Sequence, residues 1–409
     1  MSRSQARPTV ATVWTAIKIG IFVLLMTPLA AHAQTFTVLH NFTDGADGGY
    51  VYAGVTFDQQ ARIYGTASRG ADGDNGVVYR LVREGNGWVF SPIYTFRGHD
   101  GAHPYARVVF GPDGLLYGTT NQGGANRYGT VFSLQPSPTA CKSALCPWVE
   151  TVLYSFANGA DGGFPEFGDL TFDQAGNIYG TASGGGILTN GVVFKLTRSG
   201  SGWTESVLWE FGNINNDGCT PISGVIFDNA GNLYGTTNGC GSNGLGTVYE
   251  LSPTQSGWNE TILHSFTQSD NGAGAGGLIM DAEGNLYGIT SGSPGSAYEL
   301  TQQNGSWSFT LLQSFPGNDL GFAMVAPTFD SQGNLYGPLT YDGSNEAGEI
   351  FKLMPSGNQW IYSLFYQFPS CANGCLPMGA VAFDANGNMY GTTIEGGTDG
   401  YGTVWEITP

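Results

Sequence analysis

The sequence contains few positively charged residues, and this shortage limits the partners that the protein can have. Of its 409 residues only 14 are lysine or arginine, whereas 32 are aspartate or glutamate, which gives a net charge of −18. A surface of this sign repels phosphate backbones and anionic lipid head groups. The composition therefore predicts that neither nucleic acid nor a membrane surface is a partner.

Long apolar segments are also missing, apart from one short run near the start of the chain. Residues 19–26 are largely apolar, follow three basic residues, and precede small residues at 31–33 that offer a site for a signal peptidase. The run is well below the ~20 residues of a membrane-spanning helix, although an uncleaved anchor is the alternative. We expect a signal peptide over 1–33, a mature domain over 34–409 without membrane insertion, and a secreted or periplasmic location.

Sequence motifs for catalysis and for helices are absent too. The chain has neither a Gly-x-Ser-x-Gly motif nor a Gly-x-x-x-x-Gly-Lys motif, so neither a typical serine nucleophile nor a phosphate-binding loop is indicated. No segment shows the apolar periodicity of an amphipathic helix. The sequence therefore predicts an all-β protein, and an enzyme of this type would need a site assembled from scattered loops.

Glycine, in contrast, is abundant, with 65 residues, and much of it belongs to a motif that recurs seven times. Each copy has a Tyr-Gly core, and the copies lie 49 to 62 residues apart. The seven tyrosines are Tyr64, Tyr117, Tyr179, Tyr234, Tyr287, Tyr336 and Tyr390. A period of this length indicates an array of units that bury their apolar faces only against one another.

One unit contains four segments of strand length, which we call a, b, c and d. In the fourth unit they are residues 224–227, 232–237, 246–251 and 258–266, rich in β-branched and aromatic residues. The connection between a and b reads Asp-x-x-Gly in five units, which predicts a hairpin turn rather than a ladder of metal-binding carboxylates. In six units strand d begins with tryptophan, which we expect to pack on the sheet rather than to bind sugar: Trp88, Trp148, Trp203, Trp258, Trp307 and Trp360.

The two ends of the chain complement each other. The seventh unit ends at Pro409 before any strand d, and residues 35–42 align with the d segments at 151–156 and 261–266. A strand from one end that completes the sheet at the other closes a ring and removes an exposed sheet edge. The sequence thus predicts a seven-bladed β-propeller with four antiparallel strands per blade, closed by strand 35–42 in the last blade.

Six cysteines allow 15 pairings, so the sequence alone leaves the connectivity open. Proximity favours Cys141 with Cys146 and Cys371 with Cys375, which leaves Cys219 for Cys240. The last pair is supported by the topology, because the d–a loop and the b–c loop of one blade lie on the same face. A cysteine-based metal site is the alternative, but the histidines are mostly distant in sequence.

The d–a and b–c loops share one axial face, where propellers usually bind ligands. Four d–a loops carry an Asp-Gly pair whose carboxylate could hold Ca²⁺ or a polyhydroxylated ligand, although Asp-Gly is also an ordinary turn. The acidic candidates are Asp47, Asp100, Asp161 and Asp217. His99 and His103 on one loop add a candidate for metal binding or acid–base chemistry, with a solvated loop as the alternative.

The recurring motif resembles the Gloeo/Verruco ("GloVer") tandem repeat of exported bacterial proteins. Residues 227–237 with 246–251, and 383–393 with 402–407, carry the resemblance best, and it extends over residues 34–409. The resemblance implies an extracytoplasmic location and brings with it no catalytic residues.

Together these observations favour an exported, non-catalytic propeller that binds an extracellular carbohydrate or protein on the axial face. The alternative is a propeller enzyme, such as a lyase or another glycan-degrading enzyme, with a site built from the same loops. We expect no cofactor apart from a structural Ca²⁺ as an option, and the sequence does not determine the oligomeric state.

Overall fold

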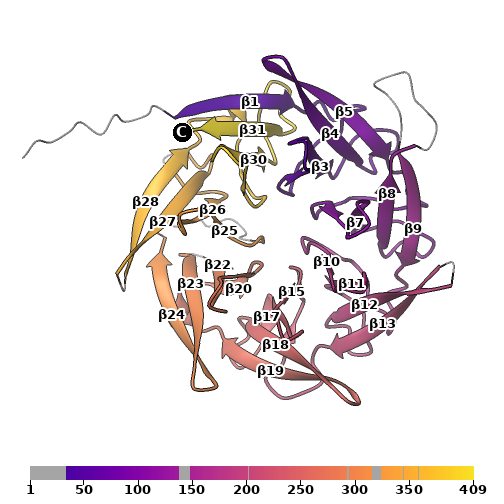
Figure 1. The fold of residues 1–409 in the computed structure, drawn as a ribbon, viewed down its shortest axis with the longest axis vertical. Coiled ribbons are helices and arrows are strands. Elements are labelled where there is room, and N and C mark those ends of the chain that lie inside the picture. Colours follow the sequence, from indigo (N-terminus) through magenta and orange to yellow (C-terminus); the bar gives the residue numbers. More distant parts are fainter. Residues whose placement is uncertain are drawn as a thin grey trace, which may run out of the picture. The chain divides into compact units, whose positions relative to one another are not determined.

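The computed structural model describes residues 34–137, 148–200, 202–292, 294–315, 324–343, 345–357 and 359–409. In this part of the chain the compact unit Gln34–Pro409 holds seven antiparallel sheets of four or five strands arranged around a common centre (Figure 1), and one two-stranded sheet in the loops. The predicted seven-bladed β-propeller with four strands per blade is therefore confirmed. No helix among the described residues is long and apolar enough to cross a membrane.

The two inner strands of each blade are short. Strand a is β2 (Thr56–Phe57), β6 (Val109–Phe110), β10 (Thr171–Phe172), β15 (Ile226–Phe227), β21 (Ile279–Met280), β25 (Thr328–Phe329) and β29 (Ala382–Phe383). Strand b is β3 (Ile63–Ala67), β7 (Leu116–Thr120), β11 (Ile178–Ala182), β16 (Leu233–Thr236), β22 (Leu286–Ser291), β26 (Leu335–Leu339) and β30 (Met389–Thr393).

The two outer strands are longer. Strand c is β4 (Val77–Glu84), β8 (Thr130–Gln135), β12 (Val192–Ser199), β18 (Thr247–Thr254), β23 (Ser296–Gln303), β27 (Glu349–Ser356) and β31 (Thr403–Thr408). Strand d is β5 (Gly87–Thr95), β9 (Val149–Ser155), β13 (Gly202–Glu210), β19 (Gly257–Ser265), β24 (Ser306–Ser314), β28 (Gln359–Gln367) and β1 (Thr35–Asn41). The loops add β14 (Gly218–Cys219), β17 (Gly239–Cys240), β20 (Ala273–Ala275) and the 3₁₀ turns η1 (Gln268–Asp270) and η2 (Cys371–Asn373).

The first described strand closes the ring, as predicted. β1 pairs antiparallel with β31, from Thr35 opposite Thr408 to Asn41 opposite Thr403 (Figure 1). The side chain of Phe42, just after β1, is fully buried. The first and the last of the described strands therefore belong to one sheet.

The Tyr-Gly motif holds each blade against the next one. The tyrosine of strand b packs edge-to-face on a strand-a phenylalanine of the following blade in six of the seven blades, for example Tyr64 on Phe110 with ring centroids 5.4 Å apart. The glycine after it leaves room for an aromatic residue of strand c, because a Cβ at Gly65 would lie 2.3 Å from the hydroxyl oxygen of Tyr79. Strand-d tryptophans pack on the same tyrosines, as Trp148 does on Tyr64.

The carboxylate of the aspartate in every a–b turn is hydrogen-bonded within its own hairpin. In all seven blades its Oδ2 accepts a hydrogen bond from the hydroxyl of the strand-b tyrosine, at 2.7 to 3.2 Å. In blade 3, Oδ1 of Asp173 also accepts from the backbone N–H groups of Ala175 and Asn177. The aspartate thus satisfies both the partly buried tyrosine hydroxyl and the backbone N–H groups of the tight turn. The carboxylates therefore act as turn residues.

Two of the three predicted disulfides lie in the described part of the chain and are confirmed. Cys219 and Cys240 are bonded, with an S–S distance of 2.09 Å, and join the d–a loop of blade 4 to its b–c loop. Cys371 and Cys375 are bonded within the loop that enters blade 7. The pair Cys141 and Cys146 lies outside the described residues.

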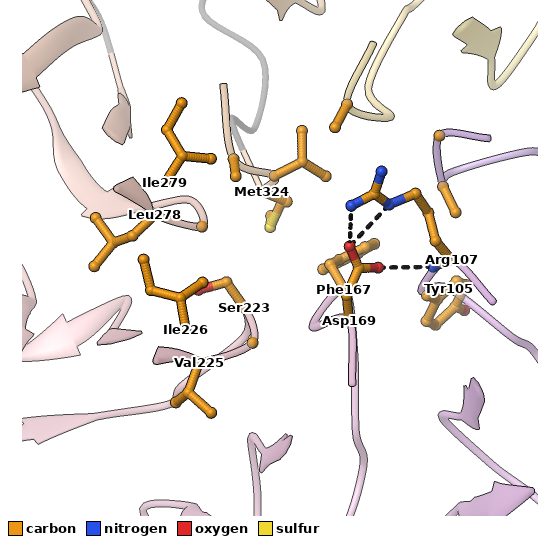
Figure 2. A pocket seen from close by; sticks show the side chains of 17 residues that line it. Tyr105, Arg107, Phe167, Asp169, Ser223, Val225, Ile226, Leu278, Ile279 and Met324 are labelled. Carbon is orange, nitrogen blue, oxygen red and sulfur yellow. Dashed lines mark hydrogen bonds and ion pairs between the residues drawn. The ribbon is translucent and has the colours of Figure 1, made fainter. Parts of the chain in front are cut away.

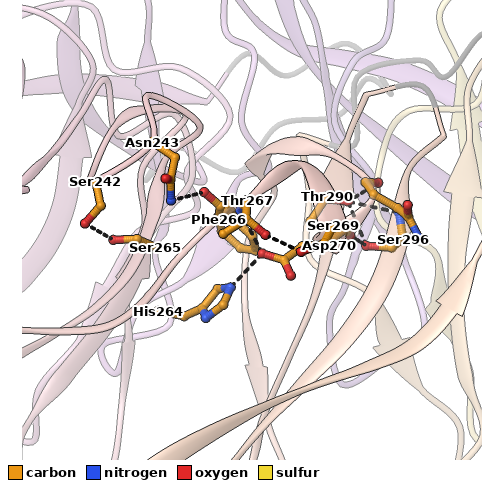
Figure 3. Close-up of polar contacts among 11 residues, drawn as sticks. Ser242, Asn243, His264, Ser265, Phe266, Thr267, Ser269, Asp270, Thr290 and Ser296 are labelled. Atoms are coloured by element: carbon orange, nitrogen blue, oxygen red, sulfur yellow. Dashed lines mark hydrogen bonds and ion pairs between the residues drawn. The ribbon is translucent and has the colours of Figure 1, made fainter.

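A second carboxylate, at the start of the d–a loop, ties that loop to strand d. In Figure 3, Oδ2 of Asp270 accepts hydrogen bonds from Nε2 of His264, at 2.9 Å, and from the backbone N–H of Thr267, at 2.7 Å. The same arrangement recurs in three other loops, as Asp47 with His40, Asp100 with Tyr94, and Asp161 with Tyr154. We call these contacts the loop clasps.

In blades 2, 3 and 4 a glutamate of strand d adds a second acidic group beside the d–a aspartate. Burial and the charge of Asp217 raise the pKa of Glu260 to about 9. Burial and the charges of Asp100 and Asp161 raise the pKa of Glu150 and Glu205 to about 7. These glutamates therefore retain protons at pH values where an exposed glutamate is ionised.

We expect removal of the closing strand to destabilise the whole ring. A chain that begins at residue 43 leaves the edge of β31 unpaired, so it should melt at a lower temperature and aggregate through that edge. Adding a peptide of residues 34–42 should restore the melting temperature by strand addition, as measured by calorimetry and light scattering. A scrambled peptide serves as the control, and equal stability of the truncated and full domains would contradict the role of β1.

Stability should also fall as the pH rises from 5 to 9. A glutamate whose pKa is raised on folding stabilises the fold below its ordinary pKa of 4.5, and this contribution is lost as the pH passes the folded value, about 9 for Glu260. Replacing Glu260 with glutamine should therefore flatten the decline of the melting temperature. Glu84→Gln, at an exposed site, is the matched control, and identical slopes for Glu260→Gln and wild type would refute the assignment.

Candidate functional site

A small cavity of about 190 Å³ lies where residues just before strand a converge from the blades. Figure 2 shows an apolar side, with Leu278, Ile279 and Met324, facing a polar side with Arg107 and Asp169. This cavity occupies the centre of the ring of strands. It is too small for an extended polymer, so a large ligand would have to bind at its mouth.

One ion pair bridges blades 2 and 3 at the cavity wall. Nε of Arg107 lies 2.8 Å from Oδ2 of Asp169, Nη2 contacts the same oxygen, and the backbone N–H of Arg107 donates to Oδ1 at 3.2 Å. The charge of Asp169 raises the pKa of Arg107 despite the opposing effect of burial. The two charges neutralise each other, so this wall offers hydrogen-bonding groups without net charge.

Three aromatic side chains from successive d–a loops gather at the mouth on the face of the d–a and b–c loops. The ring of Tyr105 lies 5.1 Å from that of Tyr52 and 5.5 Å from that of Phe167, and Tyr52 lies 6.1 Å from Phe167. Tyr105 and Phe167 also line the cavity. We call this group the aromatic cluster; all three side chains are half-buried and thus still accessible.

Polar groups border the aromatic cluster. The imidazole of His103 lies 6.5 Å from the ring of Tyr105, and its Nδ1 is 3.0 Å from the carbonyl oxygen of Ser68. Because a carbonyl only accepts, Nδ1 must carry the proton, and a neutral His103 therefore has its lone pair on Nε2. Arg69, on the b–c loop of blade 1, is exposed, with its guanidinium carbon 5.1 Å from the ring centroid of Tyr50.

The ionisable groups of the mouth are mostly neutral or paired. Burial raises the pKa of both Tyr52 and Tyr105, so their hydroxyls remain hydrogen-bond donors at neutral pH. Burial also raises the pKa of Glu166, against the effect of the 2.6 Å hydrogen bond from Oγ of Ser183. The mouth therefore presents aromatic faces surrounded by donors and acceptors, a combination suited to a neutral polar ligand.

The structure places one of the six residues predicted from the sequence beside this cluster. His103 adopts a left-handed backbone conformation, with φ of 56°, and lies next to Tyr105, whereas His99 on the same loop is exposed. The other four predicted residues are hydrogen-bonded within their own d–a loops. They are Asp47, Asp100 and Asp161, in the loop clasps, and Asp217, whose Oδ2 accepts from two backbone N–H groups.

The aromatic cluster was missed in the sequence because its members occupy an ordinary repeat position. Tyr52, Tyr105 and Phe167 each stand four residues before strand a, where Met324 and Met378 stand in blades 6 and 7. The sequence did contain one indication of the cluster: this position holds an aromatic residue in blades 1 to 3 and methionine in blades 6 and 7.

Among the described residues no group of three or more His, Cys, Asp or Glu is arranged to hold a metal ion.

Solved structures with the same fold come from several kinds of protein. The extracellular domain of a protein described as a one-component system from B. thetaiotaomicron is 11% identical, with a TM-score of 0.54; the match covers 91% of this chain and 41% of that one. An ulvan lyase is 13% identical, with a TM-score of 0.54, and the match covers 91% and 95%. The polysaccharide lyase Uly1 is 11% identical, with a TM-score of 0.51, and the match covers 93% and 94%.

At such low identity these likenesses show the fold alone. No curated protein matches the sequence. The repeat itself is recognised by one family model, which matches residues 25–166 and again 144–296, more than half of the chain. This chain therefore belongs to the Gloeobacter/Verrucomicrobia repeat family.

Proposed function

We propose that this protein is an exported, non-catalytic propeller that binds a carbohydrate at the mouth of the central cavity. The observation that carries the proposal is the aromatic cluster of Tyr52, Tyr105 and Phe167, with ring centroids 5.1 to 6.1 Å apart. Aromatic faces provide flat apolar surfaces for the C–H groups of a sugar ring, and the phenol hydroxyls supply polar contacts at their edges.

The groups beside the cluster match the hydroxyls of a sugar. The hydroxyls of Tyr52 and Tyr105 donate, Nε2 of a neutral His103 accepts, and the exposed guanidinium of Arg69 donates. The cavity behind the mouth, at about 190 Å³, is too small to take a chain of sugars. A carbohydrate would therefore lie across the mouth instead of threading the ring.

Export is supported by the two described disulfides, Cys219–Cys240 and Cys371–Cys375. Such bonds persist in oxidising compartments and are rare in the cytosol. The predicted signal peptide over 1–33 agrees with this location. A carbohydrate outside the cytoplasm is a ligand that such a protein would meet.

A second candidate function is catalysis at the same mouth, and His103 is the observation that favours it. Its Nδ1 is fixed by the carbonyl of Ser68, which leaves Nε2 of the neutral ring as a base beside Tyr105. The burial that raises the pKa of Tyr105 keeps this phenol in the acid form. A base next to an acid is the minimum required to cleave a glycan by elimination or hydrolysis.

The binding proposal predicts a loss of affinity when the aromatic faces are removed. The mature domain, residues 34–409, is first tested on a glycan array, and the best ligand is then measured by calorimetry. Tyr52→Ala and Tyr105→Ala should each weaken binding about tenfold, equivalent to about 1.4 kcal/mol. Tyr105→Phe should retain most of the affinity, because the stacking face remains.

Ile361→Ala, on an exposed part of β28, is the control for a general loss of fold. Binding that survives both Tyr→Ala changes would place the ligand elsewhere and overturn the proposal. An array without any binding glycan, combined with capture of a defined protein partner at this mouth, would replace the carbohydrate by a protein.

The catalytic alternative predicts a different pattern. If the domain releases new reducing ends from the bound glycan, His103→Ala should abolish turnover and leave the dissociation constant within about threefold of wild type. His99→Ala, an exposed histidine on the same loop, is the matched control and should retain turnover. Turnover with this pattern would refute the non-catalytic proposal, whereas binding without product would refute catalysis.

A further inference from the structure

A second concave site lies between blades 1 and 2, on the face that carries the a–b and c–d loops. Its cavity of about 610 Å³ is larger than the axial one and falls in the usual range for ligand pockets, about 300 to 1,000 Å³. Four aromatic side chains, Phe57, Tyr64, Phe110 and Trp148, form part of its wall. We call this site the blade 1–2 cleft.

Blade 1 departs from the repeat at the edge of this cleft. In blades 3 to 7 the residue four positions after the turn aspartate is an asparagine whose Nδ2 donates to Oδ2 of that aspartate. In blade 1 this position is Arg62, whose Nε donates to Oδ2 of Asp58. Tyr64 donates to the same oxygen, and Gln60 and Arg62 donate backbone N–H groups to Oδ1.

These hydrogen bonds satisfy both carboxylate oxygens of Asp58. Burial by itself would raise the pKa of Asp58, but the hydrogen bonds and charge of Arg62 outweigh it and lower the pKa. Oδ1 and Oδ2 each accept two hydrogen bonds. Asp58 therefore has little capacity left for a second cation.

Because Asp58 pairs with Arg62, it does not pair with Arg80, the second arginine of the cleft, which lies on β4. Its Nε is buried and has no hydrogen-bond partner among the residues that the structure describes, and no ion pair of Arg80 is found there. A buried charged donor without a partner is costly, and an anion bound close to the guanidinium offsets part of this cost through its charge. Arg80 also lines the blade 1–2 cleft.

In blades 3, 5 and 7 the same position on strand c holds a side chain with a polar partner, whereas in blade 6 it holds Lys352, whose Nζ lies 5.4 Å from the ring centroid of Tyr336. In blade 3, Nζ of Lys195 lies 4.0 Å from Oδ2 of Asp173. In blades 5 and 7, Glu299 and Glu406 accept hydrogen bonds of 2.7 Å from Tyr287 and Tyr390. The lack of an ion pair for Arg80 among the described residues therefore arises from the particular residues of blade 1, since the repeat alone does not require it.

We propose that the blade 1–2 cleft binds an acidic saccharide, with a carboxylate or sulfate of the sugar on Arg80 and the sugar ring against Trp148. A guanidinium matches such oxyanions with two parallel hydrogen bonds. The aromatic wall supplies the flat surface that the ring needs. Two arginines and one carboxylate, Asp58, give the cleft a local positive charge in a strongly acidic protein, which favours an anion.

The test uses the mature domain and two acidic probes, trigalacturonate and a sulfated disaccharide, measured by calorimetry at low salt. At least one probe should bind, and the fully methyl-esterified trigalacturonate should bind at least tenfold more weakly than the free acid. Arg80→Gln should weaken binding of the acidic probe tenfold or more. Trp148→Phe, which keeps an aromatic face, should weaken it less.

Arg83→Gln is the matched control, because Arg83 lies on the same strand and its exposed guanidinium lies 5.8 Å from the centroid of Trp88. It removes one positive charge and should leave binding unchanged. The double variant Tyr52→Ala and Tyr105→Ala separates this site from the axial mouth and should bind the acidic probe as wild type does.

Three results would overturn the proposal. They are the absence of binding for both acidic probes at 5 mM, equal binding of the ester and the free acid, and unchanged binding in Arg80→Gln. Loss of acidic-probe binding in the axial double variant, with Arg80→Gln unaffected, would assign the anion to the axial mouth instead. Melting curves of each variant show that the comparisons are made on folded protein.

Discussion

The buried tyrosine of strand b is the residue on which the rest of the structure depends. Its ring fills the space between one blade and the next, as Tyr64 does against Phe110, and its hydroxyl is satisfied by the turn aspartate of its own blade. A buried phenol without a partner would be unfavourable, so the aspartate and the tyrosine require each other. One hydrogen bond thus couples the inner hairpin of a blade to its packing on the neighbouring blade.

This coupling explains how much of the fold could be predicted from the sequence. Because the tyrosine, its glycine and its aspartate must recur in every blade, the number of blades and the order of strands could be read from their spacing. The closing strand was predictable for the same reason, since residues 35–42 repeat the pattern of the other d strands. The Cys219–Cys240 bond was favoured because proximity paired the other four cysteines and because the topology places the two loops on one face.

The candidate sites were harder to predict, because both proposed sites lie where residues depart from the repeat. The sequence offered the aspartates of the d–a loops either as turn residues or as ligands. In the structure, Asp100 accepts a hydrogen bond from Tyr94 and Asp161 accepts one from Tyr154. Conversely, the aromatic cluster depends on contacts between different blades, which join residues about 50 to 60 positions apart. Pattern reading within one unit does not reveal such contacts. Arg80 lacks an ion pair among the described residues because Arg62 of its own blade bonds Asp58, and this too needs side-chain contacts that the sequence does not show.

Closure by β1 also determines the order in which the molecule can be completed. Thr35 pairs with Thr408, so β1 finds its partner only after β31, the last strand of the seventh blade, has been made. Until then the last blade has three strands, and the ring stays open however well the first six blades have formed. Contacts of such long sequence separation are slow to form because of the loop entropy that they cost. The final, cooperative step of folding is therefore expected only once β31 has been synthesised, when it pairs with β1.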